Sequence, residues 1–459
     1  MYGPKAVQTL GEALSLWSTV PFAGMLLSIA LGPLLAPGLW HAHFGKISAF
    51  WAALSVISLS VFFGQQAVAG FLQVIINEYL PFIILMGALY VISGGVLITG
   101  SSSGAPGANA VMLAAGTLLA SVMGTTGAAM LLVRPLIKSN AHRQHRAMVM
   151  VFFIFLAANI GGAISPLGPP LVLGYLSGVP FFWTLRLLPH MLLAAGYLIA
   201  VYFFADTFFY RKEKKISEKN FSCSAAAAAR PFRVRGVRNV VFLAGVVAVL
   251  ALPGSARLGG FSFFGVHRTG WETARDIAVL MMAVLSFYLT PSWIHDENGF
   301  TWFPLKEVAV IFAGVFITMM PCLDILQAGK AGHLGPLLDV VSRPARYFWA
   351  TGGLSSLLDN APAYLAFFKA ALGNFYAHMP AREAVGLLIK QHPSYLEAIS
   401  AGSVFFGAFT YIGGAPNFMV RSISEESGVE MPGFIGYILK YALPVLLPLF
   451  ALETLIFFR

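Results

Sequence analysis

Long apolar stretches alternate with short polar segments along most of the chain, and this pattern predicts a membrane protein built from helices. Ten stretches are read as membrane-spanning helices, near residues 16–36, 47–64, 80–100, 148–175, 185–209, 239–253, 277–289, 304–325, 398–420 and 433–458. Two further apolar stretches, 108–137 and 345–372, are each interrupted by a polar break. We therefore expect an all-α polytopic membrane protein with about ten transmembrane helices and two re-entrant hairpins.

The second interrupted stretch, hairpin two, has the sequence LSSLLDNAP at 354–362 between two apolar arms. As helix, each arm would extend less than about 20 Å, which is too short to cross a hydrocarbon core of about 30 Å. A pair of such arms can enter the membrane, turn at mid-depth and leave on the same side. Asp359 and Asn360 would then lie at a helix N-terminus, inside a protein cavity. Hairpin one, at 108–137, has the tip Gly124-Thr125-Thr126-Gly127.

The two halves of the chain resemble each other. The tetrapeptide Ile-Gly-Gly-Ala occurs at 160–163 and again at 412–415, each time interrupting an apolar run shortly before a proline. Each copy follows a hairpin. With five spans per half, the second half must enter the membrane from the opposite side, which is an inverted repeat. We expect a first half at 1–210, a basic linker at 211–238 and a second half at 239–459.

Composition agrees with a membrane location. Charged residues make up only 10% of the chain, and mean hydropathy is +0.77. The net charge of +10 is concentrated in the 211–238 linker, so we interpret it as the positive-inside rule rather than as nucleic-acid binding. More than half of the 29 lysines and arginines then face the cytoplasm. Both termini are expected outside, in a bacterial inner membrane. Asp206 is expected to pair with Arg211 or Lys212.

Two hairpin tips and two broken helices would bring helix N-termini and bare backbone carbonyls into one cavity. Helix N-termini suit anions, and bare carbonyls suit Na⁺. Asp359 adds one acid, which can hold a proton or Na⁺. The other side chains are neutral oxygen ligands, which suit hard cations. The candidate ion- and substrate-binding residues are Thr125, Thr126, Asn159, Ser165, Ser356, Asp359, Asn360, Thr410 and Asn417, with Asp359, Asn360 and Thr126 as Na⁺ ligands.

The SLLDNAP stretch at 356–362, the hairpin tips and the paired broken helices resemble the ion-transporter superfamily. This group includes NhaD-type sodium/proton antiporters, arsenite efflux proteins, and citrate and dicarboxylate carriers. The resemblance implies a dimer that binds Na⁺ and substrate at the hairpin tips and broken helices. These positions correspond to Thr125, Thr126, Asn159, Asp359, Asn360 and Asn417. The carboxylate carriers often have Ser-Asn-Thr at both tips, whereas this chain has Gly-Thr-Thr-Gly and Leu-Asp-Asn-Ala.

The acid at the second tip favours a Na⁺/H⁺ antiporter that works by alternating access. The alternative is a Na⁺- or H⁺-coupled citrate or dicarboxylate transporter of the same fold, and a more remote one is an ion channel. No HExxH or nucleotide-binding GxxxxGK[ST] motif occurs in the sequence, so we expect neither an enzyme nor an ATP-driven pump. We expect Na⁺ or H⁺ as coupling ions, no cofactor, and the lipid bilayer and a small ion or carboxylate as partners.

Overall fold

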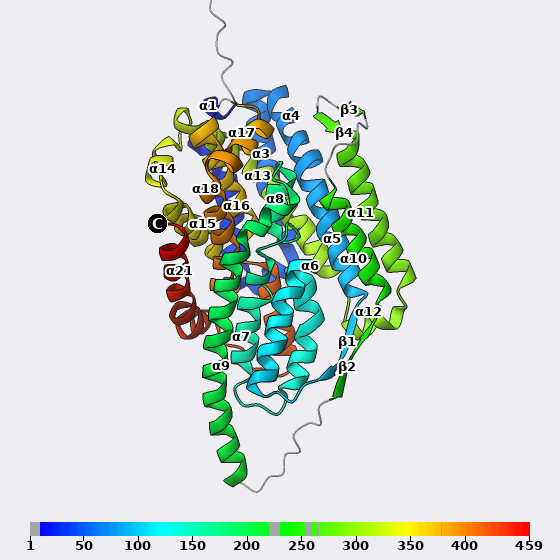
Figure 1. The fold of residues 1–459 in the computed structure, drawn as a ribbon. Helices are drawn as coiled ribbons and strands as arrows, with labels where there is room; N and C mark the ends of the chain where they lie inside the picture. Colours follow the sequence, from blue (N-terminus) through cyan, green and yellow to red (C-terminus); the bar gives the residue numbers. More distant parts are fainter. Residues whose placement is uncertain (1–9, 220–229, 253–258, 264–265, 378) are drawn as a thin grey trace, which may run out of the picture.

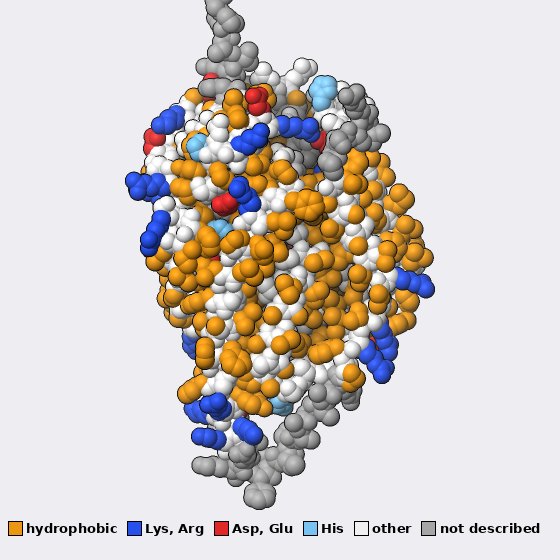
Figure 2. All heavy atoms as spheres, viewed as in Figure 1, with side chains coloured by type: hydrophobic (Ala, Val, Ile, Leu, Met, Phe, Trp, Pro, Cys, Tyr) orange, Lys and Arg blue, Asp and Glu red, His pale blue; other side chains and the backbone are white. Residues whose placement is uncertain are grey.

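The protein is described by a computed structural model that covers residues 10–219, 230–252, 259–263, 266–377 and 379–459. Its regular structure is almost entirely helical (Figure 1). The strands of the described part form two antiparallel pairs, β1 (Leu97–Ser101) with β2 (Arg230–Arg235) and β3 (Gly260–Phe263) with β4 (Val266–Thr269). On the face shown in Figure 2, apolar side chains cover the middle of the molecule, and most Lys and Arg side chains lie toward its two ends. This surface fits a polytopic membrane protein.

The helices of the first half are α1 (Leu10–Ala13), α2 (Val20–Leu35), α3 (Pro37–Phe63), α4 (Gln65–Val74), α5 (Leu80–Gly94), α6 (Pro106–Ser139), α7 (Arg146–Leu156), α8 (Pro169–Leu176) and α9 (Leu188–Lys219). A π-helical turn, Ile75–Tyr79, joins α4 to α5. The predicted span at 80–100 is wrong at its end, because the helix stops at Gly94 and the following residues form β1. There Asn298 donates to the carbonyls of Gly94 and Val96, which takes these groups out of the helical hydrogen-bond pattern.

The helices of the second half are α10 (Arg238–Ala251), α11 (Gly270–Leu289), α12 (Ser292–Asn298), α13 (Phe303–Gln327), α14 (Gly335–Val340), α15 (Pro344–Leu357), α16 (Asn360–Tyr376), α17 (Ala381–Gln391), α18 (Pro393–Phe406), α19 (Ala415–Glu426), α20 (Phe434–Tyr437) and α21 (Leu443–Phe457). Seven helical stretches of the described residues are long and apolar enough to cross a membrane, or eight if the bent pair α11–α12 is one span. The number of ten spans stays a prediction.

Helix α6 is folded back on itself and forms hairpin one. The side-chain amides of Asn109 and Asn140 exchange two hydrogen bonds, of 2.7 and 2.9 Å, although 31 residues separate them. One straight helix over that length would hold them about 46 Å apart. The reversal occurs at Gly124, whose φ of 78° lies in the region that favours glycine. Close packing of the arms depends on Gly116, where an added Cβ would lie 3.3 Å from Leu132.

Helices α15 and α16 form hairpin two. The ring of Tyr347, near the start of α15, lies 6.2 Å from that of Phe367 on α16, so the arms run antiparallel. The carboxylate of Asp359 accepts a hydrogen bond of 3.2 Å from the backbone N–H of Ala361 and thereby caps α16. In Figure 1, β1, which leads into hairpin one, lies at one end of the molecule, and α14 and α17, which flank hairpin two, lie toward the other.

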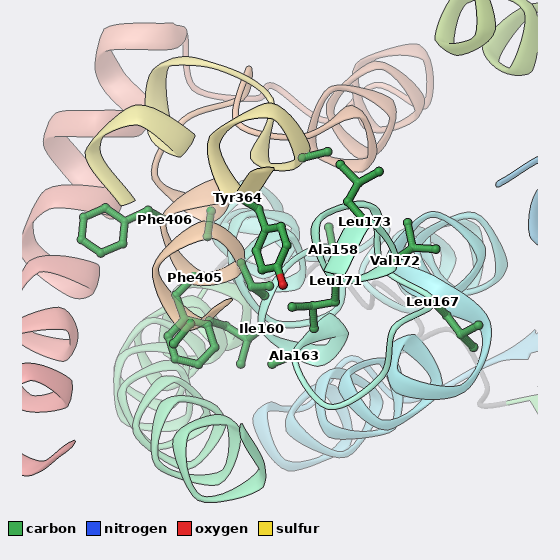
Figure 3. Packing of buried hydrophobic residues seen from close by; sticks show 14 of the residues in the cluster. Ala158, Ile160, Ala163, Leu167, Leu171, Val172, Leu173, Tyr364, Phe405 and Phe406 are labelled. Carbon is green, nitrogen blue, oxygen red and sulfur yellow. The ribbon is translucent and has the colours of Figure 1, made fainter. Parts of the chain in front are cut away.

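Equivalent helices of the two halves make equivalent contacts. Helix α2 packs on α3 as α10 packs on α11, and α3 contacts α13 as α11 contacts α5. Likewise, hairpin one contacts α19 while α16 of hairpin two contacts α8. In this last interface Tyr364 reaches toward buried residues of α8 and the first Ile-Gly-Gly-Ala break (Figure 3). Each hairpin is therefore packed against a broken helix of the other half.

A buried ionic network holds the open end of hairpin one against α9. Arg143, in the loop after α6, binds Asp206 at 2.6 Å and Glu213 at 2.7 Å, and also donates to the Gly104 carbonyl at 2.8 Å. The expected pairing of Asp206 with Arg211 or Lys212 is wrong. Asp206 points into the protein and is fully buried, whereas Arg211 and Lys212 are exposed.

Candidate functional site

The tips of both hairpins line one cavity of about 350 Å³. Gly124, Thr125, Thr126 and Gly127 contribute the wall from hairpin one, and Asp359 and Asn360 contribute the wall from hairpin two. More than 230 residues separate the two tips in the sequence. The cavity continues along α5, α13 and α19, where exposed Glu426 also lines it. The prediction that the tips meet in one pocket is therefore consistent with the geometry of the cavity.

Four helix N-termini reach this cavity. They are the second arm of hairpin one after Gly124, α8 at Pro169, α16 at Asn360 and α19 at Ala415, and each contributes residues to the wall. Backbone N–H groups of a first helical turn lack partners within the helix and carry a partial positive charge. Gly168 and Gly414, the residues before α8 and α19, provide no side-chain cap. Pro169 and Pro170 remove two donors from α8, which contributes mainly its dipole.

Four of the nine candidate residues line the cavity. Thr125 and Asn360 are buried, while Thr126 and Asp359 are half-buried. Asp359 also lines a second cavity of about 190 Å³, together with Arg421. The carboxylate therefore lies between two hollows and keeps access to both. These four residues are placed where they could contact a bound ion or substrate directly.

The other five candidates hold the two helix breaks in place. Asn159 donates to the Asn417 side chain at 2.8 Å, and Asn417 donates to the carbonyls of Gly407 and Thr410. Thr410 donates to the Ser356 carbonyl at 2.6 Å and accepts hydrogen bonds from two backbone N–H groups of the second break. The remaining hydroxyls are used locally, since Ser165 accepts from the Leu167 N–H and Ser356 donates to the Gly353 carbonyl.

Two amide oxygens near the helix breaks have no hydrogen-bond partner among the described residues. They are Oδ1 of Asn159 and Oδ1 of Asn360, and both are buried. A Cβ added at Gly407 would lie 2.7 Å from Asn159 Oδ1 and 3.6 Å from Asn360 Nδ2, so both amides meet at this turn. Leaving a buried acceptor unpaired costs about 1–3 kcal/mol. The Asn360 atom that lies near this turn is its amide nitrogen, so the two oxygens need separate partners, and a small cation that prefers oxygen ligands would satisfy Asn360 Oδ1 from the cavity.

The cavity wall includes ionisable residues that the sequence analysis did not identify as candidates. These are His41, at the start of α3, Glu307, in the first turns of α13, and Glu426, at the end of α19. Glu307 could have been found from the sequence, because it is an acid just inside a predicted span. His41 and Glu426 could not have been identified in this way, because they lie at the exposed ends of α3 and α19, where charged and polar residues are usual.

The two glycines of the second break allow a matched test of its packing. A Cβ at Gly413 would collide with the Gly407 carbonyl and lie 2.9 Å from Gly407 Cα, whereas a Cβ at Gly414 meets nothing nearer than 3.7 Å. Overpacking of this kind costs about 1–3 kcal/mol. We expect G413A to lower the thermal unfolding midpoint in detergent and G414A to leave it nearly unchanged. Equal losses in both variants would contradict this packing.

Comparison with known families gives one match that covers nearly the whole chain. The profile of a family described as "Putative citrate transport" matches residues 11–458, which is almost the whole chain. The chain belongs to this family. No curated protein matches the chain. Membership of the citrate-transport family confirms the resemblance to the ion-transporter superfamily, and it favours a carboxylate as cargo over the Na⁺/H⁺ antiporter expected from the second tip.

Proposed function

We propose that the protein is a secondary active transporter for citrate or a related carboxylate, driven by a gradient of H⁺ or Na⁺. The observation that carries this proposal is the convergence of four helix N-termini on one cavity, because helix N-termini attract anionic groups. The cavity volume of about 350 Å³ also falls in the range of small-molecule sites. Family membership supports the same class of cargo.

The charges around the cavity explain why a cation accompanies the anion. No Lys or Arg among the described residues lines the 350 Å³ cavity, while Asp359, Glu307 and Glu426 add negative charge. A carboxylate entering this cavity needs counter-charge beyond the helix dipoles. A proton or Na⁺ at Asp359, or Na⁺ beside the unpaired oxygen of Asn360, supplies it. Anion and cation then bind together, which couples their movement.

Transport of radiolabelled citrate into proteoliposomes tests the proposal. We expect citrate to accumulate when an inward gradient of either H⁺ or Na⁺ is imposed, and to equilibrate without accumulation when no gradient is present. Protein-free liposomes and liposomes without a gradient are the controls. If citrate, succinate and malate all fail to enter above the protein-free level under both gradients, the proposal is wrong.

A second candidate is the Na⁺/H⁺ antiporter, which is favoured by Asp359 beside neutral oxygen ligands. A carboxylate that binds either Na⁺ or H⁺ exchanges the two ions without any anion. The same proteoliposomes with an internal pH dye distinguish the candidates. Antiport predicts a pH change on adding Na⁺ in the absence of citrate, whereas coupled transport predicts a requirement for citrate.

The proposal includes an inverted repeat, with the 211–238 linker inside and both termini outside a bacterial inner membrane. Residues 220–229 of this linker lie outside the described part of the chain. Ser103, before hairpin one, and Ser342, before hairpin two, are both exposed. In a background without Cys223 and Cys322, we expect S103C and S342C to react with an impermeant maleimide from opposite membrane sides. Labelling from the same side would exclude the inversion.

A homodimer is also part of the proposal, and cross-linking in the membrane tests it.

A further inference from the structure

A group of ionisable side chains lies apart from the cavity, where α13, α16 and the π-helical turn before α5 meet. It consists of Glu78 in the π-helical turn, Asp324 on α13 and Lys369 on α16, together with Gln327, and is called the Lys369 cluster below. Lys369 lies nine residues beyond Asn360 on α16, about 14 Å along the helix from the tip. Asp324 lies nine residues beyond Val315, the last α13 residue that lines either cavity at the hairpin tips.

One contact in the cluster is a direct hydrogen bond, and the carboxylates are linked to it by electrostatic interactions. Lys369 Nζ donates to Gln327 Oε1 at 3.0 Å. Lys369 interacts electrostatically with Glu78 and Asp324, and the two carboxylates repel each other. Gln327 and Asp324 are three residues apart and so face the same way from α13. Backbones approach closely here, because a Cβ at Gly373 would lie 3.0 Å from the Gln327 carbonyl oxygen.

Glu78 is only partly satisfied in this position. Its Oε2 atom is buried and has no hydrogen-bond partner among the described residues. The π-helical turn places it there by adding one residue to the helical turn, a feature that often marks functional sites. An unpaired carboxylate oxygen within a membrane protein is costly, and such residues usually serve ion or proton movement.

The charge of the cluster identifies its ligand class. Two carboxylates and one ammonium group leave a formal charge of −1, and one added proton makes the cluster neutral. Na⁺ fits less well, since it would need several oxygen ligands, while the oxygen of Gln327 is already used by Lys369 and the ammonium group repels a second cation.

Other titratable groups on the neighbouring elements are occupied elsewhere. Tyr79, next to Glu78, donates its hydroxyl to the Ala309 carbonyl at 2.9 Å. The hydroxyl of Tyr364 on α16 lies against Gly174 of α8. Cys322 on α13 and Glu12 on α1, which packs against α13, are half-buried.

We propose that Glu78 and Asp324, together with Lys369, form a proton-binding site separate from the cargo cavity. Lys369 belongs to hairpin two, which carries Asp359 and Asn360, whereas Glu78 and Asp324 belong to helices outside the hairpins. The proton therefore neutralises a contact between hairpin two and its surroundings. Losing it leaves a net negative charge in an apolar interior, which favours a different position of hairpin two. As a source of H⁺ coupling, this site rests on the proposed transport function.

Infrared difference spectroscopy of the purified protein between high and low pH tests the site without any cargo. A buried carboxylic acid that gains a proton gives a carbonyl band at high frequency. Because Asp359 can give a band of its own, the cluster is tested in the D359N background: we expect D359N alone to retain a band, and E78Q or D324N added to D359N to remove it. The matched control D339N changes an exposed acid paired with Lys330 and should leave the band intact.

Two results would overturn the proposal. One is a band that persists in the D359N background when E78Q, D324N or both are added. The other is a band that disappears on adding Na⁺ at constant pH, which would indicate a cation site. Because all variants keep the size of the original side chain, their folding is checked by the unfolding midpoint. In proteoliposomes, E78Q should retain citrate–citrate exchange and lose pH-driven accumulation. Absence of citrate exchange in the unmodified protein would reject the transport proposal but leave the spectroscopic result standing.

Discussion

Replacing Asp359 by asparagine should abolish gradient-driven transport while the protein still folds. Asp359 is the acid at the tip of hairpin two and lines both cavities. Asparagine keeps the shape and can still cap α16, since an amide oxygen accepts the Ala361 N–H. It cannot hold a proton or attract a cation as a carboxylate does. We expect citrate accumulation in proteoliposomes to fall by roughly 10- to 100-fold or more, the scale seen when a supporting ligand of an ion is removed.

The matched control is D339N, the same chemical change at an acid whose side chain is 64% exposed. It should transport at the original rate. The unfolding midpoint of D359N should remain near that of the unmodified protein. Normal accumulation in D359N would exclude Asp359 as the coupling residue, whereas a strong loss of stability would point to a purely structural role at the helix cap.

Replacing Arg143 by methionine should cause the largest loss of stability. The Arg143 side chain is 1% exposed and the Asp206 side chain is fully buried. Without Arg143, Asp206 becomes an uncompensated buried charge, and removing one partner of such a pair costs about 3–5 kcal/mol. The open end of hairpin one also loses its link to Glu213 and the Gly104 carbonyl. We expect a large fall in the unfolding midpoint and in the yield of folded protein.

A second variant separates the buried charge from the lost contacts. The double variant R143M/D206N should recover part of the stability, because the unpaired charge is then gone. R382M removes an arginine whose side chain is 75% exposed and pairs with Glu272 at the surface, so it should cost no more than about 1 kcal/mol. If R143M is as stable as R382M, the network does not hold hairpin one.

Much of the fold follows from local sequence signals. Long apolar runs predict most of the long helices, although α3 begins ten residues before the predicted span at 47–64 and α9 ends ten residues beyond the one at 185–209. The tips of both hairpins are marked by residues that helices rarely contain in their interior, with Gly124 at φ 78° as the clearest case. The end of α5 was missed because Asn298, from the other half of the chain, binds the carbonyls that close the helix.

The candidate site was only partly predictable, because residues of one chemical type take different roles according to their neighbours. Asn360 and Asn417 are both buried amides near helix breaks, yet only Asn360 lines the cavity. The Asn417 side chain donates to two backbone carbonyls and accepts a hydrogen bond from Asn159. Nothing local in the sequence distinguishes them. The same holds for Asp206, whose partner comes from a distant loop and not from the nearby basic residues.

Hydrophobicity and residue type along the chain were enough to define helices, breaks and the presence of an acid at a hairpin tip, since these depend on neighbours within one or two turns. Which oxygens remain unpaired, which helix ends share a cavity and which charges meet depended on contacts between segments hundreds of residues apart. Such contacts are selected by how whole helices pack, and small residues at a few crossing points set that packing. The cavity and the Lys369 cluster both arise at that level.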